Sequence, residues 1–402
     1  MKITEKHRSM TTLHRVISLT LSLGVMTSSA QLYLITGSPT PKAPAGYIFA
    51  LYRLGAEGTV GKVADLVNDR TGPGWIAASQ DLRKAVLAPK APAQPVVVVD
   101  FDTGAVAKSC LEPRVNLFLI ERWLVDLPGR GPAYAELLSG SGYVIQTRAM
   151  LLDPSIPCER SFVPMEPADA KYLVASGQAG VADAGGFDWM KVYIGKDGSL
   201  VRPLGRDWTV QFSYRVPTAL FSDLAQPDAM AIANNRSLLL LSVIDFSNPG
   251  SFRLLVFRKS DQTWHVVSTM GDHATCQRAF GEFVAAVGDL RKGRDTKGES
   301  AGGSEWRKQS VATGPSMSGL FSTSWAIFPG YLYLYDSATE RTYTIITNQG
   351  DSEILLVENG AVYYRASDRL YRADLTDQGL TPGRLLATSD VIRDAHWAFV
   401  KH

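Results

Sequence analysis

Histidine is the first residue type to consider for catalysis, because its imidazole exchanges a proton near neutral pH. Three of the six histidines lie within the body of the chain, at His265, His273 and His396. Asp272 precedes His273, and Asp394 lies two residues before His396. An acid beside a histidine can orient the ring for acid–base work, but such a pair is also a common hydrogen bond at the end of a strand. Both interpretations stay open.

Motifs for other chemistries are absent from the sequence. It contains no His-Glu-x-x-His, Cys-x-x-Cys or glycine-rich phosphate loop. A serine hydrolase of the nucleophile-elbow type needs Gly-x-Ser-x-Gly, and neither 139–142 nor 314–319 has that spacing. The sequence therefore predicts no catalytic residue by motif.

Asp100 and Asp102 follow a run of four valines and form the only close pair of carboxylates that we consider for metal binding. Paired carboxylates can bind Ca²⁺, so Ca²⁺ is a possible ligand, although we predict no cofactor or metal site. The alternative is structural, because an aspartate that begins a turn accepts hydrogen bonds from its own backbone. Asp336 begins a similar turn between two other strands, which favours the structural interpretation.

Aromatic and basic residues gather near the C-terminus and suggest a ligand platform. The predicted ligand-binding residues are Tyr364, Arg365, Tyr371, His396 and Trp397. Successive side chains of a strand point to opposite faces, so packing inside the fold is the competing interpretation.

The elements that must position these residues are short strands. Residues 331–373 alternate between apolar and polar residues and turn at Asp336, Asn359-Gly360 and Ser367-Asp368, as hairpins do. Comparable runs recur from residue 46 onward, with turns near Asp102, Asp153, Asp197, Asp261 and Asp377. The pattern predicts an all-β fold, a β-propeller of six or seven four-stranded blades over residues 46–402. Residues 59–69 are the best candidate helix, and 396–400 are expected to share a blade, or an equivalent position, with 75–79.

The stretches 353–373 and 396–399 resemble blades of bacterial TolB-like and WD40-like β-propeller repeat proteins, with the resemblance extending over residues 322–400. This resemblance implies a propeller fold. It implies no particular function, because propellers of this broad group include both binding scaffolds and enzymes.

The N-terminus has the order of a signal peptide. Four basic residues precede an apolar run at 16–25, and Ser28-Ser29-Ala30 supplies small residues before a cleavage point. We predict a signal peptide at 1–30, with an uncleaved membrane anchor as the alternative, and a Pro/Gly-rich linker at 31–45. Removal of 1–30 leaves 37 basic and 38 acidic residues, so no basic field for nucleic acid remains.

The three cysteines are Cys110, Cys158 and Cys276. In an exported protein an odd number suggests one bridge and one leftover thiol, and we predict Cys110–Cys158 as the pair. Three buried, reduced cysteines are the alternative.

These features favour an exported, periplasmic or extracellular propeller that binds a protein, a peptide or an envelope glycan. It would meet a membrane only through an N-terminal anchor. The alternative function is a hydrolase or lyase that uses a carboxylate and a histidine, or Ca²⁺, in the central channel. A third is a structural subunit of an envelope assembly. Residues 291–304 are almost without apolar side chains and predict an exposed insertion.

Overall fold

The computed structural model describes residues 31–39, 47–69, 75–88, 95–111, 117–127, 129–140, 145–163, 179–180, 191–203, 209–224, 227–234, 236–245, 252–267, 275–289, 330–347 and 351–402. The signal-peptide region, residues 291–304 and His273 lie outside them. No helix in this part of the chain is long and apolar enough to cross a membrane.

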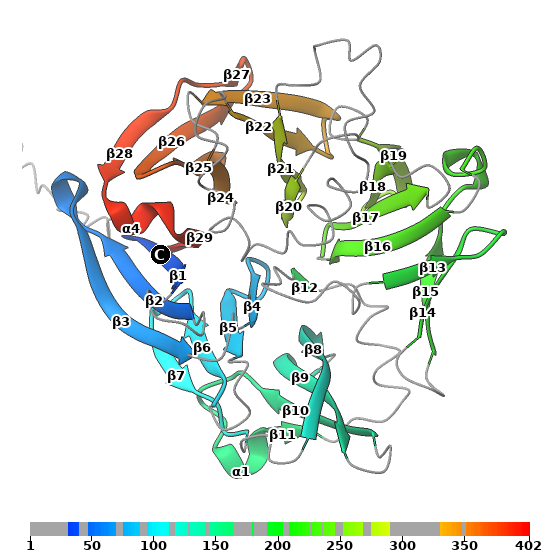
Figure 1. Ribbon diagram of the computed structural model, residues 1–402, viewed down its shortest axis with the longest axis horizontal. Coiled ribbons are helices and arrows are strands. Elements are labelled where there is room, and N and C mark those ends of the chain that lie inside the picture. Colours follow the sequence, from blue (N-terminus) through cyan, green and yellow to red (C-terminus); the bar gives the residue numbers. More distant parts are fainter. Residues whose placement is uncertain are drawn as a thin grey trace, which may run out of the picture.

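The described residues form six antiparallel sheets around a common centre, which confirms an all-β fold of propeller type (Figure 1). The first sheet joins β29 (Ala395–Lys401), β1 (Gln31–Pro39), β2 (Tyr47–Leu54) and β3 (Val60–Asp69). The second contains β4 (Trp75–Ser79), β5 (Lys84–Ala88), β6 (Val97–Asp100) and β7 (Val106–Lys108). The third contains β8 (Leu117–Leu127), β9 (Gly131–Gly140), β10 (Ile145–Leu151) and β11 (Phe162–Val163).

The fourth sheet has eight strands and is twice the size of most others. It contains β12 (Ala179–Gly180), β13 (Lys191–Ile194), β14 (Ser199–Pro203), β15 (Thr209–Arg215), β16 (Pro227–Asn234), β17 (Leu238–Asp245), β18 (Phe252–Arg258) and β19 (Thr263–Val266). The fifth contains β20 (Thr275–Phe280), β21 (Phe283–Asp289), β22 (Gly330–Asp336) and β23 (Arg341–Thr347). The sixth contains β24 (Ser352–Glu358), β25 (Ala361–Ala366), β26 (Arg369–Thr376), β27 (Gly379–Leu380) and β28 (Arg384–Thr388).

Helical segments are short. They are η1 (Ala56–Gly58), α1 (Cys158–Ser161), η3 (Thr218–Leu220) and α4 (Asp390–Arg393). The helix predicted at 59–69 is wrong, because these residues form β3. Its pairing with β2 skips Val63 and Leu66, which are therefore bulged residues. Each bulge inserts one residue into the strand and interrupts the alternation of apolar and polar side chains. With two bulges, the apolar residues of β3 are spaced as in an amphipathic helix.

The first and last strands meet. Gln31 of β1 pairs with Lys401 of β29, so the part of the predicted linker at 31–39 is wrong and forms a buried strand instead. The apolar run Leu32–Ile35 accounts for this, since its side chains are buried on both faces of the sheet. Residues 75–79 form β4, in a different sheet from β29; each is an edge strand on the inner side of its sheet (Figure 1).

The core lies between neighbouring sheets. Phe399 of β29 stacks on Tyr33 at 5.0 Å and on Phe101 of the second sheet at 4.3 Å between ring centroids. Burying apolar surface stabilises by about 25 cal/mol per Å². Each sheet is too thin to bury its own side chains, so its stability depends on its neighbours.

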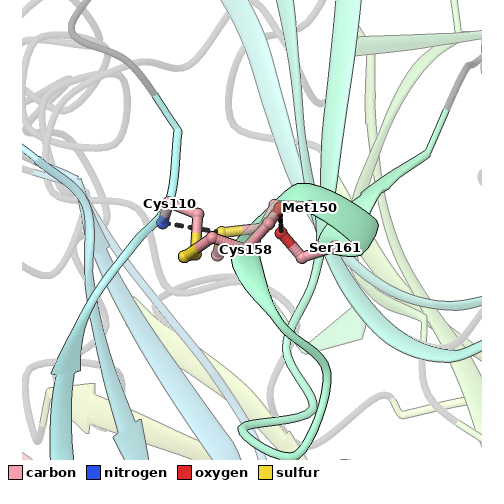
Figure 2. Close-up of a disulfide and its surroundings, with 4 residues drawn as sticks. All are labelled: Cys110, Met150, Cys158 and Ser161. Atoms are coloured by element: carbon pink, nitrogen blue, oxygen red, sulfur yellow. Dashed lines mark hydrogen bonds between the residues drawn. A yellow bond between two sulfur atoms is a disulfide. The ribbon is translucent and has the colours of Figure 1, made fainter.

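Cys110 and Cys158 form a disulfide, as the sequence predicted (Figure 2). Cys110 follows β7 in the second sheet, and Cys158 begins α1 beside the third. The bridge therefore joins two neighbouring sheets by a covalent bond. The backbone N–H of Cys110 also points at Sδ of Met150, at 3.1 Å.

Candidate functional site

Tight turns from several sheets meet on one side of the ring. These turns are 80–83, 236–237, 259–262, 337–340 and 359–360, and we call this side the short-turn face. Hydrogen bonds between sheets place them together: Arg236 N–H donates to Asp81 Oδ2 at 2.8 Å, and Arg258 Nη1 donates to the carbonyl of Ala338 at 3.4 Å. Successive connections of an antiparallel sheet alternate between its two ends. The strand ends at Pro39, Ala88, Asp245 and Asp289 therefore lie at the opposite end, which we call the long-connection face because more residues separate successive strands there in the sequence.

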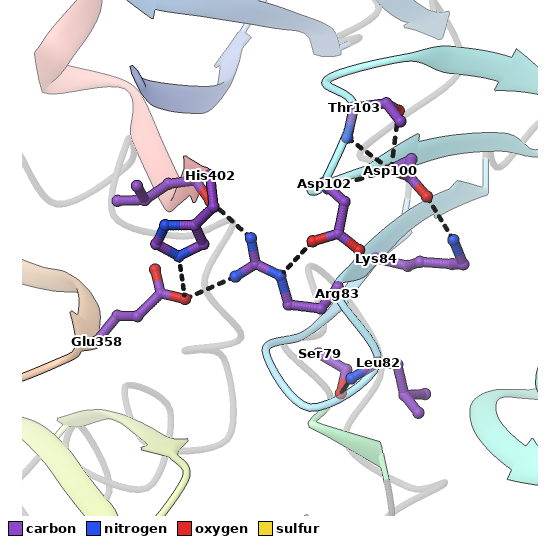
Figure 3. A network of polar contacts seen from close by, with 10 residues as sticks. Ser79, Leu82, Arg83, Lys84, Asp100, Asp102, Thr103, Glu358 and His402 are labelled. Carbon is purple, nitrogen blue, oxygen red and sulfur yellow. Dashed lines mark hydrogen bonds and ion pairs between the residues drawn. The ribbon is translucent and has the colours of Figure 1, made fainter. Parts of the chain in front are cut away.

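Arg83 is the centre of the polar network on the short-turn face (Figure 3). Its Nε donates to Asp102 Oδ1 at 2.9 Å, and its Nη1 donates to Glu358 Oε1 at 2.6 Å. Its Nη2 donates to the carbonyl of Val400 at 2.6 Å. His402 Nε2 lies 3.4 Å from the same Glu358 oxygen. One guanidinium thus joins the second sheet, the sixth sheet and the end of β29.

The backbone conformation of the β4–β5 turn directs the Arg83 side chain toward these partners. Arg83 has φ +53°, a left-handed conformation uncommon for residues other than glycine. It closes the β4–β5 turn, and its carbonyl accepts the N–H of Phe101 at 2.8 Å. Beside it, Lys84 Nζ bonds Asp100 Oδ2 at 2.6 Å. The turn therefore presents two cations to the two carboxylates of the β6–β7 turn.

The same turn reaches two further strands. Gln80 Nε2 donates to the carbonyl of Val357 in β24 at 2.8 Å, and Asp81 Oδ2 accepts the N–H of Arg236 at 2.8 Å. Arg236 lies two residues before β17. The strands β17 and β24 belong to different sheets of the ring (Figure 1). Residues 80–83 consequently bridge the short-turn face from the second sheet to the first, fourth and sixth. The buried atoms Gln80 Oε1 and Glu358 Oε2 have no partner among the described protein groups.

This cluster could not be predicted from the sequence, because Arg83 and the groups that it binds are far apart in the chain. Arg83 and Glu358 are 275 residues apart, and Arg83 and Val400 are 317 apart. The one local signal was the pair Asp100 and Asp102, which the structure places opposite Lys84 and Arg83.

The structure favours the structural interpretation of Asp100. Its Oδ1 accepts the N–H groups of Asp102 and Thr103, and the Thr103 hydroxyl at 2.8 Å. Burial alone would raise its pKa, but the bonds from Lys84 and Thr103 outweigh that effect and lower it. Asp336 caps its own turn through Ala338 and Thr339 in the same way. No group of three or more His, Cys, Asp or Glu able to hold a metal occurs among the described residues.

The residues predicted to bind a ligand lie mostly in the interior. Tyr364, Arg365, His396 and Trp397 are 6%, 1%, 7% and 3% exposed. Tyr371 is half-buried and stacks on Tyr364 at 5.2 Å. Trp397 packs on Phe280 at 5.4 Å. These positions fit the packing interpretation, and ligand binding by them stays a prediction.

Arg365 and His396 have structural contacts. Arg365 donates to Asp351 at 2.6 Å, to Glu353 at 3.1 Å and to the carbonyl of Ala395 at 3.0 Å. Burial opposes its charge, but these carboxylates outweigh burial and raise the pKa of Arg365. His396 is the bulged residue where β29 pairs with β1, and its Nε2 lies 3.2 Å from Gly37 O.

A second polar cluster lies at the outer rim, on the edge strand β19. Thr263 Oγ1 is 2.8 Å from His265 Nε2, and His265 Nδ1 is 3.5 Å from Glu340 Oε1 of the fifth sheet. Thr263 also donates to Asp261 at 2.7 Å. Hydroxyl, imidazole and carboxylate in this order resemble a nucleophile–base–acid arrangement. A hydroxyl has one proton, so while Thr263 donates to Asp261 it caps the turn and cannot donate to His265 as a nucleophile would.

Comparisons with known proteins place the chain in no family. No family model and no curated protein matches it. Apo AztD from Citrobacter koseri aligns with 92% of this chain and 98% of its own, at 8% identity and a TM-score of 0.40. A candidate 6-phosphogluconolactonase from Bacteroides uniformis aligns with 92% of this chain and 99% of its own, at 10% identity and a TM-score of 0.40. Likeness at this level assigns no activity.

Proposed function

We propose that this chain is an exported seven-bladed β-propeller that acts by binding a protein, a peptide or an envelope glycan on its long-connection face. The observation that carries the choice of face is the bridge of residues 80–83. Their contacts with three other sheets occupy the short-turn face with internal hydrogen bonds. Loops carry a large share of the binding residues in proteins, and in the sequence the longer segments between strands follow β1, β5, β17 and β21, whose ends lie at the opposite face.

Contacts between inner strands support the number seven. β4 contacts β8 and β12, and β8 contacts β12; β16, β20, β24 and β29 contact one another in succession. β12 pairs with β16 and joins the two groups. This gives seven inner strands, one for each four-stranded blade, if the eight-stranded sheet is two blades joined edge to edge.

Export is supported by two independent features. Disulfides persist in oxidising compartments, and Cys110–Cys158 is formed. The cleavage point predicted after Ala30 lies directly before Gln31, the first residue of β1. Cleavage there would leave the closing pair of strands intact.

The test is to attach the mature chain, from Gln31, to a support in two orientations. Attachment through a tag after His402 leaves the long-connection face free. Attachment through Asp368→Cys, in the β25–β26 turn and in a Cys276→Ser background, blocks that face. Each support is incubated with purified peptidoglycan fragments and, separately, with solubilised envelope proteins. We expect saturable binding of one class only in the first orientation. Equal binding in both orientations, or none in either, would overturn the proposal.

A hydrolase is a second candidate, favoured by the Thr263–His265–Glu340 arrangement. Its site is on the rim strand β19 rather than in the channel where the sequence analysis placed it. The test is hydrolysis of p-nitrophenyl acetate by the wild-type chain, Thr263→Val and His265→Asn. A hydrolase loses its rate in both variants at an unchanged melting temperature. Equal rates in all three proteins would eliminate this candidate.

A further inference from the structure

A row of three polar side chains crosses the sixth sheet, on strands β25, β26 and β28 (Figure 1). Tyr363 of β25 lies directly opposite Arg372 of β26, and Arg372 lies directly opposite Arg384 of β28. Residues directly opposite each other in antiparallel strands point to the same face of the sheet, with Cβ atoms about 4.5–5.5 Å apart. Two guanidinium groups and a phenol therefore lie side by side on one face.

This face of the sixth sheet is turned toward the first sheet. Tyr363 is half-buried and packs, together with Tyr52 and Leu54 of β2, against the apolar cluster that the two sheets share. The guanidinium carbon of Arg372 lies over the Tyr363 ring, 5.8 Å from its centre. The Arg372 side chain is 37% exposed, and Arg384 is exposed. The row is thus open to solvent on one side and rests on apolar side chains, where a hydrogen bond is stronger than in water.

The two arginines are matched by a single carboxylate. Asp374 Oδ1 accepts a hydrogen bond from Arg372 Nε at 2.8 Å and lies 2.7 Å from Arg372 Nη2. Arg384 forms no ion pair with a carboxylate in the part of the chain that the structure describes. Like charges directly opposite each other destabilise a sheet. The row therefore has an excess of positive charge, and an anion that contacts both guanidinium groups would remove their repulsion.

All three residues have hydrogen-bond donors to offer to such an anion. Arg372 uses Nε and Nη2 on Asp374, which leaves Nη1, and Arg384 has its whole guanidinium group. The Tyr363 hydroxyl makes no hydrogen bond to another described residue. Burial raises the pKa of this hydroxyl, while the charges of Arg372 and Arg384 act in the opposite direction. The hydroxyl therefore stays protonated at neutral pH and can donate.

We propose that Tyr363, Arg372 and Arg384 bind a tetrahedral oxyanion, the phosphate or sulfate group of a ligand, at the boundary between the first and sixth sheets. Guanidinium groups bind such oxyanions through parallel N–H donors, and these charge-assisted hydrogen bonds are about twice as strong as neutral ones. The Tyr363 hydroxyl adds a donor from a third strand. The site does not depend on the proposed binding function, so either proposal can fail alone.

The experiment measures how inorganic phosphate and, separately, sulfate protect the arginines of the mature chain from phenylglyoxal, which modifies guanidinium groups. Sodium chloride keeps the ionic strength constant, and peptide mass mapping gives the rate at each arginine. Arg369 is the control, because it is exposed on the same strand and, by the alternation of side chains, points to the opposite face from Arg372. We expect the anion to slow modification of Arg372 and Arg384 with one shared midpoint and to leave Arg369 unchanged. The anion with the lower midpoint identifies the group that the ligand carries.

Three variants with unchanged melting temperatures complete the test. Arg384→Gln should raise the anion concentration needed to protect Arg372 about tenfold, because charge-assisted hydrogen bonds are lost. Tyr363→Phe should raise the midpoint at both arginines by a smaller factor. Arg369→Gln removes the same charge from the same strand and should leave the midpoint unchanged.

Two kinds of result would overturn the proposal. Equal protection of Arg369, Arg372 and Arg384, or a midpoint that Arg369→Gln raises as much as Arg384→Gln does, would show only a general attraction of anions to positive charge. Absence of protection by both phosphate and sulfate would show that the row binds neither oxyanion.

Discussion

Two arginines hold the closing strand β29, one at each end, and they do so in different surroundings. Arg365 donates to the carbonyl of Ala395, and Arg83 donates to the carbonyl of Val400. Each also binds two carboxylates. The Arg365 side chain is 2% exposed, whereas that of Arg83 is 21% exposed. The contacts are alike, so the comparison isolates the effect of burial.

The difference teaches where such a contact stabilises most. Arg365 cannot be removed without leaving charge in the interior, since Glu353 is only 5% exposed. If Arg83 is removed, water can take over part of its hydrogen bonding, because the site is partly exposed. Removing one member of a buried ion pair costs about 3–5 kcal/mol, while an ordinary hydrogen bond contributes about 0.5–1.5 kcal/mol.

The largest effect is therefore expected for Arg365→Met. It should lower the free energy of unfolding by about 3–5 kcal/mol, because Asp351 and Glu353 lose their cation. Urea unfolding monitored by tryptophan fluorescence measures this. Combining it with Glu353→Met should recover part of the loss, whereas a loss that simply adds would show that the two residues act independently.

Opening the disulfide should be the next largest effect. Cys110→Ser with Cys158→Ser removes a bridge across 48 residues, and is expected to cost about 2–4 kcal/mol. The disulfide does not involve β29. Comparing its loss with that of Arg365 therefore shows whether closure of the ring or the link between neighbouring sheets contributes more to the free energy of unfolding. The wild-type chain with and without reductant is the matched measurement. No change on reduction would mean that the bridge does not constrain the unfolded chain.

Arg83→Gln should have a smaller effect than Arg365→Met, about 1–2 kcal/mol, since three hydrogen bonds are lost at a site that water can reach. Hydrogen exchange should become faster in β29 near Val400 and stay unchanged near Ala395. A destabilisation equal to that of Arg365→Met would break the comparison.

The smallest effect should appear when the pH is lowered far enough to protonate Asp100, in the β6–β7 turn beside Arg83. The pKa of Asp100 is lowered in the folded chain, so its contribution is complete above its unfolded value of about 4 and is lost as the pH falls through its folded value. Asp100→Asn should therefore flatten the fall in melting temperature below pH 4. An unchanged slope would show that other carboxylates are responsible.

Much of the sheet structure could be read from the sequence, because alternation and turn chemistry are local. The turns predicted at Asn359-Gly360 and Ser367-Asp368 join β24 to β25 and β25 to β26. β3 could not be recognised, because its bulges at Val63 and Leu66 depend on the partner strand β2. β1 was hidden by the prolines and glycines that follow it.

The candidate site was less predictable than the sheets. Arg365 stands among tyrosines in the sequence, which suggested a surface platform. Its burial depends on Ala395, thirty residues away in another sheet. Arg83 carried no signal at all, since nothing near it in sequence indicates Glu358 or Val400. Residues joined only by closure of the ring are invisible to local patterns.

The pairing of Gln31 with Lys401 also has a consequence for folding, because it joins two strands that lie far apart in the sequence. Contacts between such distant residues form slowly, because a long loop must close before any bond is gained. Until β29 is available, β1 presents a free strand edge with Leu32, Leu34 and Ile35 uncovered, which is the kind of surface on which chains aggregate. During synthesis β29 appears after the other described strands. Pairing with β29 is therefore the step that covers this edge of β1, and a chain truncated before Ala395 should need a chaperone.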